Sequence, residues 1–367
     1  MLHYIVPNLL GPPGGIARYC RLVCQALLDL GLPLRVTSLA DRPEMAERAR
    51  VLFPGMHYET GNGSRVEFVR LVTTACLRER PDILLVGHPH FAGLGQILAS
   101  LSGAKTVAFV YGIDVWEPLS WTRRRGLQAA TLVIAISQFT MEKAQQVNGI
   151  KSEKGRILYN CLDPEFQGAL AAKVTAPRLL TVGRMSLAEQ YKGHDYVIRA
   201  LPALLARFPN LTYHIIGDGD GRPLLENLAE QVGVRPSVHF HGFVPEEELQ
   251  RQYESATVFI MPSQAEGFGF VFAEAMAYGL PVIGGNRDAT PEVVADGETG
   301  LLVDPTSVTE IRSAITRLLA DEDLRKNMGQ AGQMRVKQLF SYGAFKQNLG
   351  AYLAELGTMQ TSTLGQE

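Results

Sequence analysis

Short apolar runs alternate with amphipathic segments along the whole chain of 367 residues. The runs are rich in Val, Ile, Leu and Phe and are bounded by Gly, Pro or polar residues, which is typical of buried strands. Six such runs are predicted strands in the first half: 3–7, 33–40, 81–87, 105–112, 130–137 and 155–160. Six more are predicted in the second half: 177–183, 211–217, 238–243, 256–263, 280–285 and 300–304.

The segments between these runs carry apolar residues at helical spacing. In residues 16–30, for example, Ile16, Tyr19, Val23 and Leu27 share one face of a predicted helix. Near-continuous apolar strands that alternate with helices form parallel sheets covered on both faces. The predicted fold class is therefore α/β.

The alternation restarts after residues 162–177, whose composition is typical of a linker. We predict two doubly wound, Rossmann-like parallel-sheet domains, residues 1–165 and 175–340. Ligands of such sheets bind beyond the carboxyl ends of the strands. The two domains are expected to face each other, so that these ends line one interdomain cleft.

Composition is that of an ordinary globular protein, with 46% hydrophobic and 20% charged residues. The formal net charge is −2, so nothing global indicates binding of nucleic acid. Residues 1–170 nevertheless hold 18 basic and 14 acidic side chains, a net charge of +4, against 17 and 23 in the rest. This excess favours an anionic membrane surface or a phosphorylated acceptor, although solvated surface charge explains it equally well.

Cysteine usage and the N-terminus bear on the compartment. The four cysteines show no metal-binding or disulfide spacing, which fits a reducing cytoplasm. The first residues, MLHYIVPNLL, are typical of a first strand and not of a leader peptide. No apolar run approaches the roughly 18 residues of a membrane span. We expect a cytoplasmic protein, with peripheral contact to the inner face of the membrane through its first domain.

The stretch SQAEGFGFVFAEAMAYG, residues 263–279, carries two glutamates eight residues apart in an apolar segment. The predicted helix begins at about Phe268 and is polar only at Glu274, so it should be buried, and a buried carboxylate needs a partner. Glu266 precedes the helix start, where free N–H groups suit an anion such as phosphate. The pair fits a ligand site with hydroxyl acceptors around a phosphate pocket. Two capping or ion-paired glutamates are the alternative.

Two cations follow the first predicted strand of the second half. Arg184 stands at the strand end, and Lys192 opens the next helix. An Arg fork and a Lys point charge together can neutralise a diphosphate. Taken alone, each would be an ordinary surface residue. Combined with Glu266 and Glu274, they predict a pocket for a nucleotide diphosphate.

Two glycine-rich turns also follow strands. GPPGG, residues 11–15, places Gly15 at a helix start, where amides can approach phosphate or simply form a tight turn. GDGDG, which starts at Gly217, lacks the acidic residue of a dinucleotide fingerprint further on. We interpret it as a turn that lets backbone approach a nucleotide; a divalent metal on Asp218 and Asp220 is the alternative.

Further polar residues fall at strand ends of the first half. His88 and His90 have no third metal ligand suggested nearby, so they are expected to line the cleft on the acceptor side. Tyr111 and Asp114 are expected there too. The basic run 122–126 is typical of a solvated helix face and, secondarily, of a lipid-headgroup contact. No metal site is predicted.

The ordered set of Arg184, Lys192 and EGFGFVFAEA resembles the retaining glycosyltransferases of family 4, which have the GT-B fold. The segment 281–305 is similar to the one that follows in that family, and the similarity extends from GGIARY to about residue 340. The resemblance implies transfer of a hexose, with retention, from a UDP- or GDP-linked sugar to a saccharide, a lipid-linked or a small-molecule acceptor. It implies no cofactor and no metal ion. It also implies a last helix, about 341–356, that returns to the first domain.

The resemblance implies a role for each matching residue. Arg184 and Lys192 would bind the donor diphosphate, and Glu266 would hold hydroxyls of the donor sugar; these three form the predicted catalytic set. Glu274 would accept from the ribose hydroxyls. The remaining predicted donor-binding residues would meet sugar, phosphate or base, and they are Gly15, Gly217, Phe243, Val244, Gly267, Phe268, Gly269 and Phe270.

The chain departs from the family pattern at one position, and three alternative functions stay open. Many relatives have His-Gly where this chain has Tyr111-Gly112, so Tyr111 is expected to position a sugar or acceptor without supplying a cation. The alternatives are a GT-B sugar-nucleotide epimerase, a nicotinamide-dependent dehydrogenase and a non-catalytic sugar-nucleotide-binding module. The missing dinucleotide fingerprint disfavours the dehydrogenase. The predicted pathway is polysaccharide or glycolipid biosynthesis.

Overall fold

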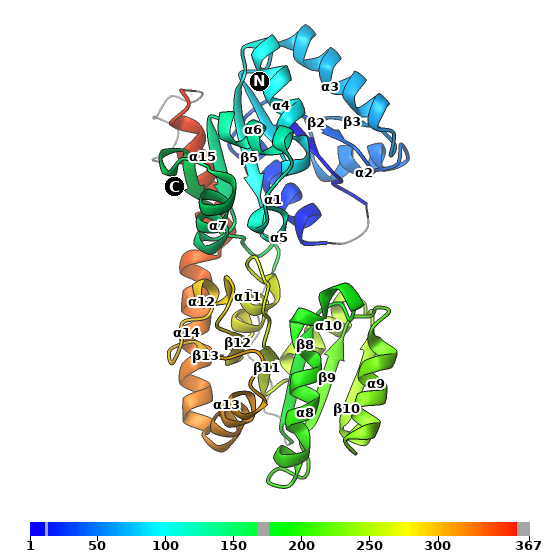
Figure 1. The fold of residues 1–367 in the computed structure, drawn as a ribbon, viewed down its shortest axis with the longest axis vertical. Helices are drawn as coiled ribbons and strands as arrows, with labels where there is room; N and C mark the ends of the chain where they lie inside the picture. Colours follow the sequence, from blue (N-terminus) through cyan, green and yellow to red (C-terminus); the bar gives the residue numbers. More distant parts are fainter. Residues whose placement is uncertain (12–13, 167–175, 358–367) are drawn as a thin grey trace. The chain divides into compact units, whose positions relative to one another are not determined.

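The chain folds into two compact units (Figure 1). The first comprises Met1–Asp163 and the C-terminal segment that begins at Tyr342, and the second comprises Pro164–Ser341. None of the helices described is long and apolar enough to cross a membrane.

A computed structural model describes residues 1–11, 14–166 and 176–357. Residues 12–13 of the GPPGG turn and most of the predicted linker lie outside the described residues.

Seven parallel strands form the sheet of the first unit, in the order β3-β2-β1-β4-β5-β6-β7. They are β1 (Leu2–Val6), β2 (Leu34–Ser38), β3 (His57–Thr60), β4 (Ile83–Val86), β5 (Lys105–Val110), β6 (Leu132–Ala135) and β7 (Gly155–Ile157). The six predicted strands are confirmed, but sequence reasoning misses β3. This edge strand is short and only half-buried, so it lacks the apolar run that marks a central strand.

Helices cover both faces of the first sheet. They are α1 (Gly15–Asp29), α2 (Met45–Leu52), α3 (Arg65–Glu79), α4 (Ala92–Ser102), α5 (Ile113–Trp116), α6 (Trp121–Ala129), α7 (Gln138–Asn148) and α15 (Tyr342–Ala354), with the 3-10 turns η1 (Pro89–Phe91) and η2 (Ser152–Lys154). Phe68, Leu98 and Leu127 from three of these helices share one core with the sheet. Helix α15 packs against α1, and the Tyr342 hydroxyl donates a hydrogen bond of 2.6 Å to Asp29 of α1.

Six parallel strands form the sheet of the second unit, in the order β10-β9-β8-β11-β12-β13. They are β8 (Arg178–Val182), β9 (Thr212–Ile216), β10 (Val238–Gly242), β11 (Val258–Met261), β12 (Val282–Gly285) and β13 (Gly300–Val303). All six predicted strands of this half are confirmed.

The second sheet is also covered on both faces. Its helices are α8 (His194–Leu205), α9 (Arg222–Gln231), α10 (Glu246–Glu254), α11 (Phe270–Ala277), α12 (Thr290–Val293), α13 (Val308–Ala320) and α14 (Glu322–Leu339), with the 3-10 turns η3 (Leu187–Lys192) and η4 (Arg235–Ser237). Leu201 of α8 and Ile315 of α13 share a core with Tyr213 and Ile260 of the sheet, whereas α11 packs against α14. Two parallel sheets between helices confirm the predicted α/β fold class of two Rossmann-like domains.

Candidate active site

The loops after β8, β9 and β10 meet at one edge of the second sheet, because all its strands are parallel. Glycines bring the backbones of these loops together: Gly183 N–H donates to Ile216 at 2.9 Å and Gly217 N–H to Gly242 at 2.8 Å. Gly217 has φ of 124°, and a Cβ there would lie 2.2 Å from the carbonyl oxygen of Gly183. Only glycine fits this position, so the edge presents backbone rather than side chains.

The first turn of α11 lies at the same edge, after β11. Gly269 takes a left-handed conformation, with φ of 82°, and the helix begins at Phe270 instead of the predicted Phe268. Gly279, with φ of 70°, follows the helix as predicted. Because the N–H groups of a first turn have no partner within the helix, this end is suited to an anion.

The structure joins the three predicted catalytic residues in one chain of ion pairs. Lys192 Nζ donates to Glu266 Oε1 at 2.8 Å, and Glu189 Oε2 lies 3.7 Å from the same ammonium. The other oxygen of Glu189 pairs with Arg184. Burial by itself would lower the pKa of Lys192, but the charge and hydrogen bond of Glu266 outweigh it and raise the pKa. Sequence reasoning misses Glu189, which nothing distinguishes from an exposed helix residue.

A buried aspartate positions Glu266. The backbone N–H of Glu266 donates to Asp288 Oδ2 at 2.7 Å, and Thr290 N–H donates to Asp288 Oδ1 at 2.9 Å. Burial raises the pKa of Asp288 to about 6, although these bonds favour its charged form. Asp288 lies in the loop after β12, and its place just beyond a buried strand is the signal that could have found it.

Glu274 is buried in α11, as predicted for the polar position of this helix. The Tyr253 hydroxyl of α10 donates to Glu274 Oε2 at 2.9 Å. The ring of Tyr253 stacks on Tyr278, with centroids 5.1 Å apart. The two glutamates are therefore held by different elements, Glu266 by a lysine and Glu274 by a tyrosine.

The other predicted donor-binding positions of this unit differ in exposure. Phe243, after β10, is 74% exposed and Val244 is half-buried, so an open aromatic ring follows the glycine-rich edge. The Phe268 side chain is buried and packs edge-to-face on Phe340, with centroids 5.2 Å apart. Phe268 can therefore offer a ligand only its backbone, and Gly267 beside it is half-buried.

Both aspartates of GDGDG accept hydrogen bonds from backbone N–H groups. Asp218 Oδ1 accepts from Gly219 N–H at 2.8 Å, and Asp220 Oδ1 accepts from Leu187 N–H at 2.8 Å. Over the described ranges of the chain, no group of three or more His, Cys, Asp or Glu side chains is arranged to hold a metal ion.

In the first unit, the predicted histidines lie against each other. Their ring centroids are 4.4 Å apart, and His88 Nδ1 accepts from the backbone N–H of His90 at 3.2 Å. Burial lowers the pKa of His88 to about 4, helped by His90 and Arg123. His88 is therefore neutral at pH 7, and its Nδ1 is already engaged as an acceptor.

Tyr111 and Asp114 are bonded into the end of β5. The Tyr111 hydroxyl is buried and donates to the Gly87 carbonyl at 2.9 Å, while its backbone N–H donates to Asp114 Oδ1 at 3.1 Å. Burial raises the pKa of Asp114 to about 7. The Tyr111 hydroxyl therefore already donates its proton to the Gly87 carbonyl. The expected contact of Tyr111 with a sugar or acceptor stays a prediction.

Asp41 anchors Leu9 and Leu10, which follow β1. Its buried carboxylate accepts from Leu9 N–H at 2.7 Å, from Leu10 N–H at 3.2 Å and from the Tyr58 hydroxyl at 2.8 Å. Gly15, further along the chain, is the exposed first residue of α1. Sequence reasoning misses Asp41, although a polar residue soon after a buried strand is again the available signal.

A "Glycosyltransferase Family 4" model matches residues 13–166, and a "Glycosyl transferases group 1" model matches residues 163–335. A GDP-mannose-dependent alpha-(1-6)-phosphatidylinositol monomannoside mannosyltransferase of Mycolicibacterium smegmatis is 31% identical over 280 residues, which is 72% of each chain. The chain belongs to this glycosyltransferase family.

Other similar proteins agree. A D-inositol 3-phosphate glycosyltransferase of Corynebacterium urealyticum is 35% identical over 87% of this chain and 86% of its own. The crystal structure of HepE from Anabaena in complex with UDP has a TM-score of 0.80 at 20% identity, covering 96% of this chain and 99% of its own. At that identity the likeness shows the fold alone, which is GT-B. The predicted resemblance to glycosyltransferases is thus confirmed. The alternative of a nicotinamide-dependent dehydrogenase does not agree with this family.

Proposed function

We propose that this glycosyltransferase moves a hexose, with retention, from a UDP- or GDP-linked sugar to a saccharide, a lipid-linked or a small-molecule acceptor. The observation that carries the proposal is the chain of ion pairs from Arg184 through Glu189 and Lys192 to Glu266. Two cations at the edge of a parallel sheet are neutralised here by carboxylates. A donor diphosphate would replace those carboxylates as the partner of both cations.

The names of similar proteins support a nucleotide sugar as the donor. The mycolicibacterial relative is named as GDP-mannose-dependent, and HepE was crystallised with UDP. The exposed ring of Phe243, with Val244, would meet the base, and Glu274 would accept from the ribose hydroxyls. Gly217 and the amides from Gly267 to Phe270 would approach phosphate and sugar.

The proposed chemistry is electrostatic. As the bond between the sugar and the diphosphate breaks, negative charge grows on the leaving oxygen. Arg184, Lys192 and the amides at the start of α11 would stabilise that charge. Glu266 would hold the sugar through its hydroxyls. Retention would follow from departure and attack on the same face, so no carboxylate of the enzyme needs to act as nucleophile.

The first unit would supply the acceptor side and approach the phosphate at Gly15. His88, His90, Tyr111 and Asp114 are the proposed acceptor or cleft residues. No metal ion or cofactor is proposed, because two cations and a helix start provide the positive charge. We further propose a cytoplasmic enzyme of polysaccharide or glycolipid synthesis, at the inner face of the membrane, with no nucleic acid partner.

The test starts from the purified protein and a panel of UDP-, GDP- and ADP-sugars, with binding followed by ligand-observed NMR. Donor consumption is then measured with and without saccharide and lipid-linked acceptors, in the presence of EDTA. We expect one donor class to bind, turnover that needs an acceptor, and an α-linked product from an α-linked donor. A β-linked product would refute retention, and epimerisation without acceptor would favour the epimerase alternative. Binding without any turnover would favour a binding module.

A further inference from the structure

Helices α8 and α9 of the second unit lie side by side and form a pocket of about 290 Å³ together with the turn η3 (Figure 1). The described residues that line it come from η3 and the segment just before it, from α8, and from α9 with the glycine that precedes it. None of them belongs to α11 or to the loop that carries Glu266. This α8–α9 pocket is therefore separate from the contacts proposed for the donor sugar and ribose.

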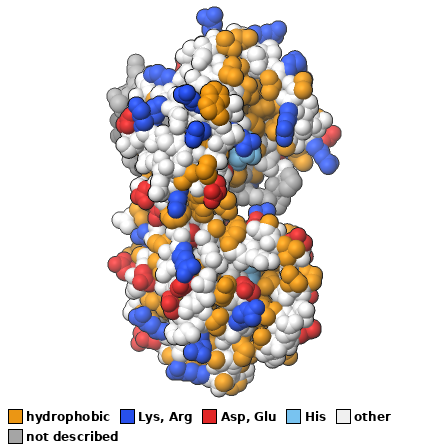
Figure 2. Space-filling model, in the orientation of Figure 1, with side chains coloured by type: hydrophobic (Ala, Val, Ile, Leu, Met, Phe, Trp, Pro, Cys, Tyr) orange, Lys and Arg blue, Asp and Glu red, His pale blue; other side chains and the backbone are white. Residues whose placement is uncertain are grey.

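The α8–α9 pocket has an apolar side and a charged side. Leu224 and Leu228 of α9 line the apolar side. The charged groups are Glu189 of η3 and, from α8, Asp195 and Arg199, which lie 3.9 Å apart. Figure 2 shows basic and acidic side chains interspersed over the visible face of the second unit, so surface charge alone does not distinguish this place. The two sides of the pocket favour a small organic ligand that is partly apolar and partly polar.

Two buried polar atoms of the pocket residues have no hydrogen-bond partner within the described part of the chain. One is Nε2 of His194, the first residue of α8, which is only 4% exposed. Burial, with a smaller effect of Lys192, lowers the pKa of His194 to about 3, so its ring is neutral at pH 7 and can accept a hydrogen bond. The other is Glu189 Oε2, which lies 3.7 Å from the Lys192 ammonium. A donor bound in the pocket could supply the missing partner of both atoms.

Glu189 connects the α8–α9 pocket to the proposed donor site. Its carboxylate pairs with Arg184 and with Lys192. A donor diphosphate that takes over both cations would leave Glu189, whose side chain is 13% exposed, without a counter-charge. A carboxylate withdrawn from water is costly unless it is paired. Donor binding would therefore favour a new cation beside Glu189, a step that rests on the proposed function.

We propose that the α8–α9 pocket binds a small organic amine with an apolar body, and that this amine and the nucleotide sugar strengthen each other's binding. The ammonium group would donate to Glu189 and His194, and the apolar body would lie against the leucines of α9. Once an ammonium neutralises Glu189, Arg184 and Lys192 are held less firmly by it and become available to the diphosphate. By linkage, each ligand raises the affinity of the other by the same factor.

Other classes of ligand fit the α8–α9 pocket less well. A metal ion alone would leave the leucine side without a contact. An anion would meet the carboxylates of Glu189 and Asp195, with Arg199 as the cation on the pocket wall. A neutral ligand could fill the space but would leave Glu189 without a counter-charge when the donor is bound.

Calorimetry with the purified full chain tests the proposal. Tryptamine is the probe, and tryptophol, which carries a hydroxyl in place of the amine, is the matched neutral probe. We expect tryptamine to bind at least about tenfold more tightly than tryptophol, because only the amine forms charge-assisted hydrogen bonds. UDP or GDP, whichever binds, should tighten tryptamine binding by at least about fivefold, and tryptamine should tighten nucleotide binding by the same factor.

Two variants separate the pocket from its coupling to the donor site. Leu224→Trp fills the pocket from a position that is 57% exposed, and it should weaken tryptamine binding at least about tenfold while nucleotide binding by itself stays within about twofold. Met334→Trp, at a similarly exposed position of α14, is its control. Glu189→Gln should remove both the preference for the amine and the mutual effect of the two ligands. Glu230→Gln, exposed on α9, is the control for that change.

Amine binding and nucleotide binding are separate measurements, so this inference and the proposed function can fail independently. If no nucleotide binds, the proposed function fails, whereas tryptamine binding that Leu224→Trp abolishes still supports the pocket. The inference is overturned if tryptamine does not bind, if tryptophol binds equally well, or if Leu224→Trp leaves tryptamine binding unchanged. It is also overturned if a bound nucleotide leaves the affinity for tryptamine unchanged.

Discussion

The ammonium of Lys192 lies 2.8 Å from the carboxylate of Glu266, and their side chains are only 13% and 15% exposed. Seventy-four residues of sequence separate the two, yet they come from loops of adjacent strands, β8 and β11. Glu266 is the nearest carboxylate to the Lys192 ammonium, so replacing either residue changes the charge balance of the other. The proposed donor would have to enter between them and Glu189.

Replacing Glu266 tests the carboxylate of this pair. Glu266→Gln keeps the size and a hydrogen-bonding group but removes the charge that raises the pKa of Lys192. We expect turnover to fall by about a hundredfold or more, because a contact in the transition state is lost. Steady-state kinetics with the best donor measures it, with the exposed Glu298→Gln as control. Near-normal kcat in the Glu266 variant would remove this residue from the site.

Replacing the cations tests the phosphate role. Arg184→Ala and Lys192→Ala should each weaken binding of a nucleoside diphosphate by about tenfold to a hundredfold, since a charge-assisted hydrogen bond contributes roughly 1.5–3 kcal/mol. Binding of the bare nucleoside should change by less than about twofold. Calorimetry compares the two ligands, and Arg199→Ala, half-exposed on α8, is the control. Equal losses for both ligands would argue against a phosphate contact.

Asp41 is expected to act on ligand binding through Leu9 and Leu10. Asp41→Asn weakens the acceptor for their backbone N–H groups, so these two residues should be held less firmly. We expect kcat/KM for the nucleotide sugar to fall by about tenfold, mostly through KM. Asp82→Asn, an exposed carboxylate at the other end of the sheet, is the control. A lower Tm with an unchanged KM would mean that Asp41 serves stability alone.

His3 makes the first unit sensitive to acid. Burial, with smaller effects of Arg35 and His57, lowers its pKa from 6.5 to about 3. As the pH falls, His3 takes up a proton in the unfolded chain before it does so in the folded one. The free energy of unfolding is therefore highest above pH 6.5 and decreases as the pH falls toward 3. Between pH 7.5 and 5 the loss is about 2 kcal/mol.

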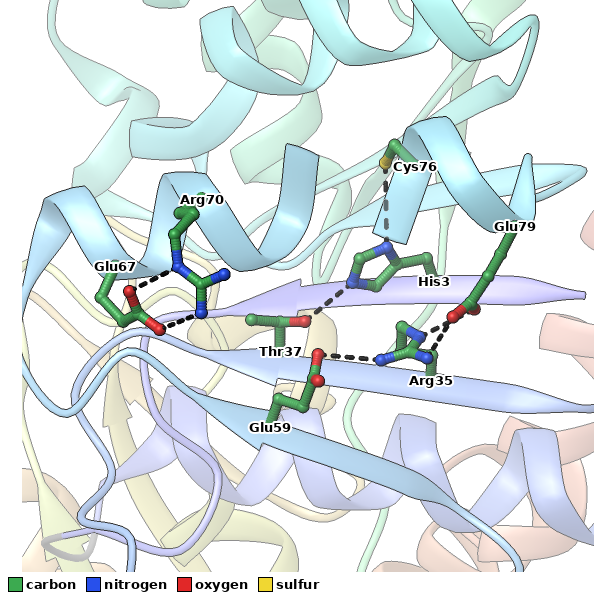
Figure 3. Close-up of polar contacts among 8 residues, drawn as sticks. All are labelled: His3, Arg35, Thr37, Glu59, Glu67, Arg70, Cys76 and Glu79. Carbon is green, nitrogen blue, oxygen red and sulfur yellow. Dashed lines mark hydrogen bonds and ion pairs between the residues drawn. The ribbon is translucent and has the colours of Figure 1, made fainter. Parts of the chain in front are cut away.

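Urea unfolding at both pH values measures this effect. The unfolding midpoint of His3→Gln should depend less on pH than that of the wild type. His57, which is exposed, supplies the control. His57→Gln keeps the buried, neutral His3, so its unfolding midpoint should depend on pH as that of the wild type does. A wild-type pH dependence in His3→Gln would show that His3 is not the group responsible. Figure 3 shows the contacts of the His3 ring with Thr37 and Cys76, and their change in His3→Gln is the same at both pH values.

Tyr111→Phe removes the buried hydrogen bond to the Gly87 carbonyl and a long contact of 3.9 Å with Cys20 Sγ. We expect the free energy of unfolding to fall by about 0.5–1.5 kcal/mol and kcat/KM to fall by less than about tenfold. Thermal denaturation and steady-state kinetics on the same sample separate the two effects. If this variant loses as much activity as Glu266→Gln, Tyr111 takes part in the chemistry.

Local sequence determined the elements of this protein and the edge at which they place polar groups. Apolar runs specify strands and 3.6-residue spacing specifies helices, because both depend on which face of a short segment is buried. Gly279 marked a helix end for the same local reason. Since parallel strands all end at one edge, Arg184, Lys192 and Glu266 were predictable as strand-end residues.

Only the tertiary structure decided which of these residues touch. The pairing of Lys192 with Glu266 depends on β8 lying beside β11, a strand order set by the packing of the whole unit. Glu189 escaped detection for the same reason, and Asp288 and Asp41 carried only the general signal of a polar residue soon after a buried strand. Each of the three gains its role from a backbone or a charge that the fold brings to it from another element. Edge strand β3 also needed the sheet, because a half-exposed strand is stabilised by its neighbour more than by its own apolar content.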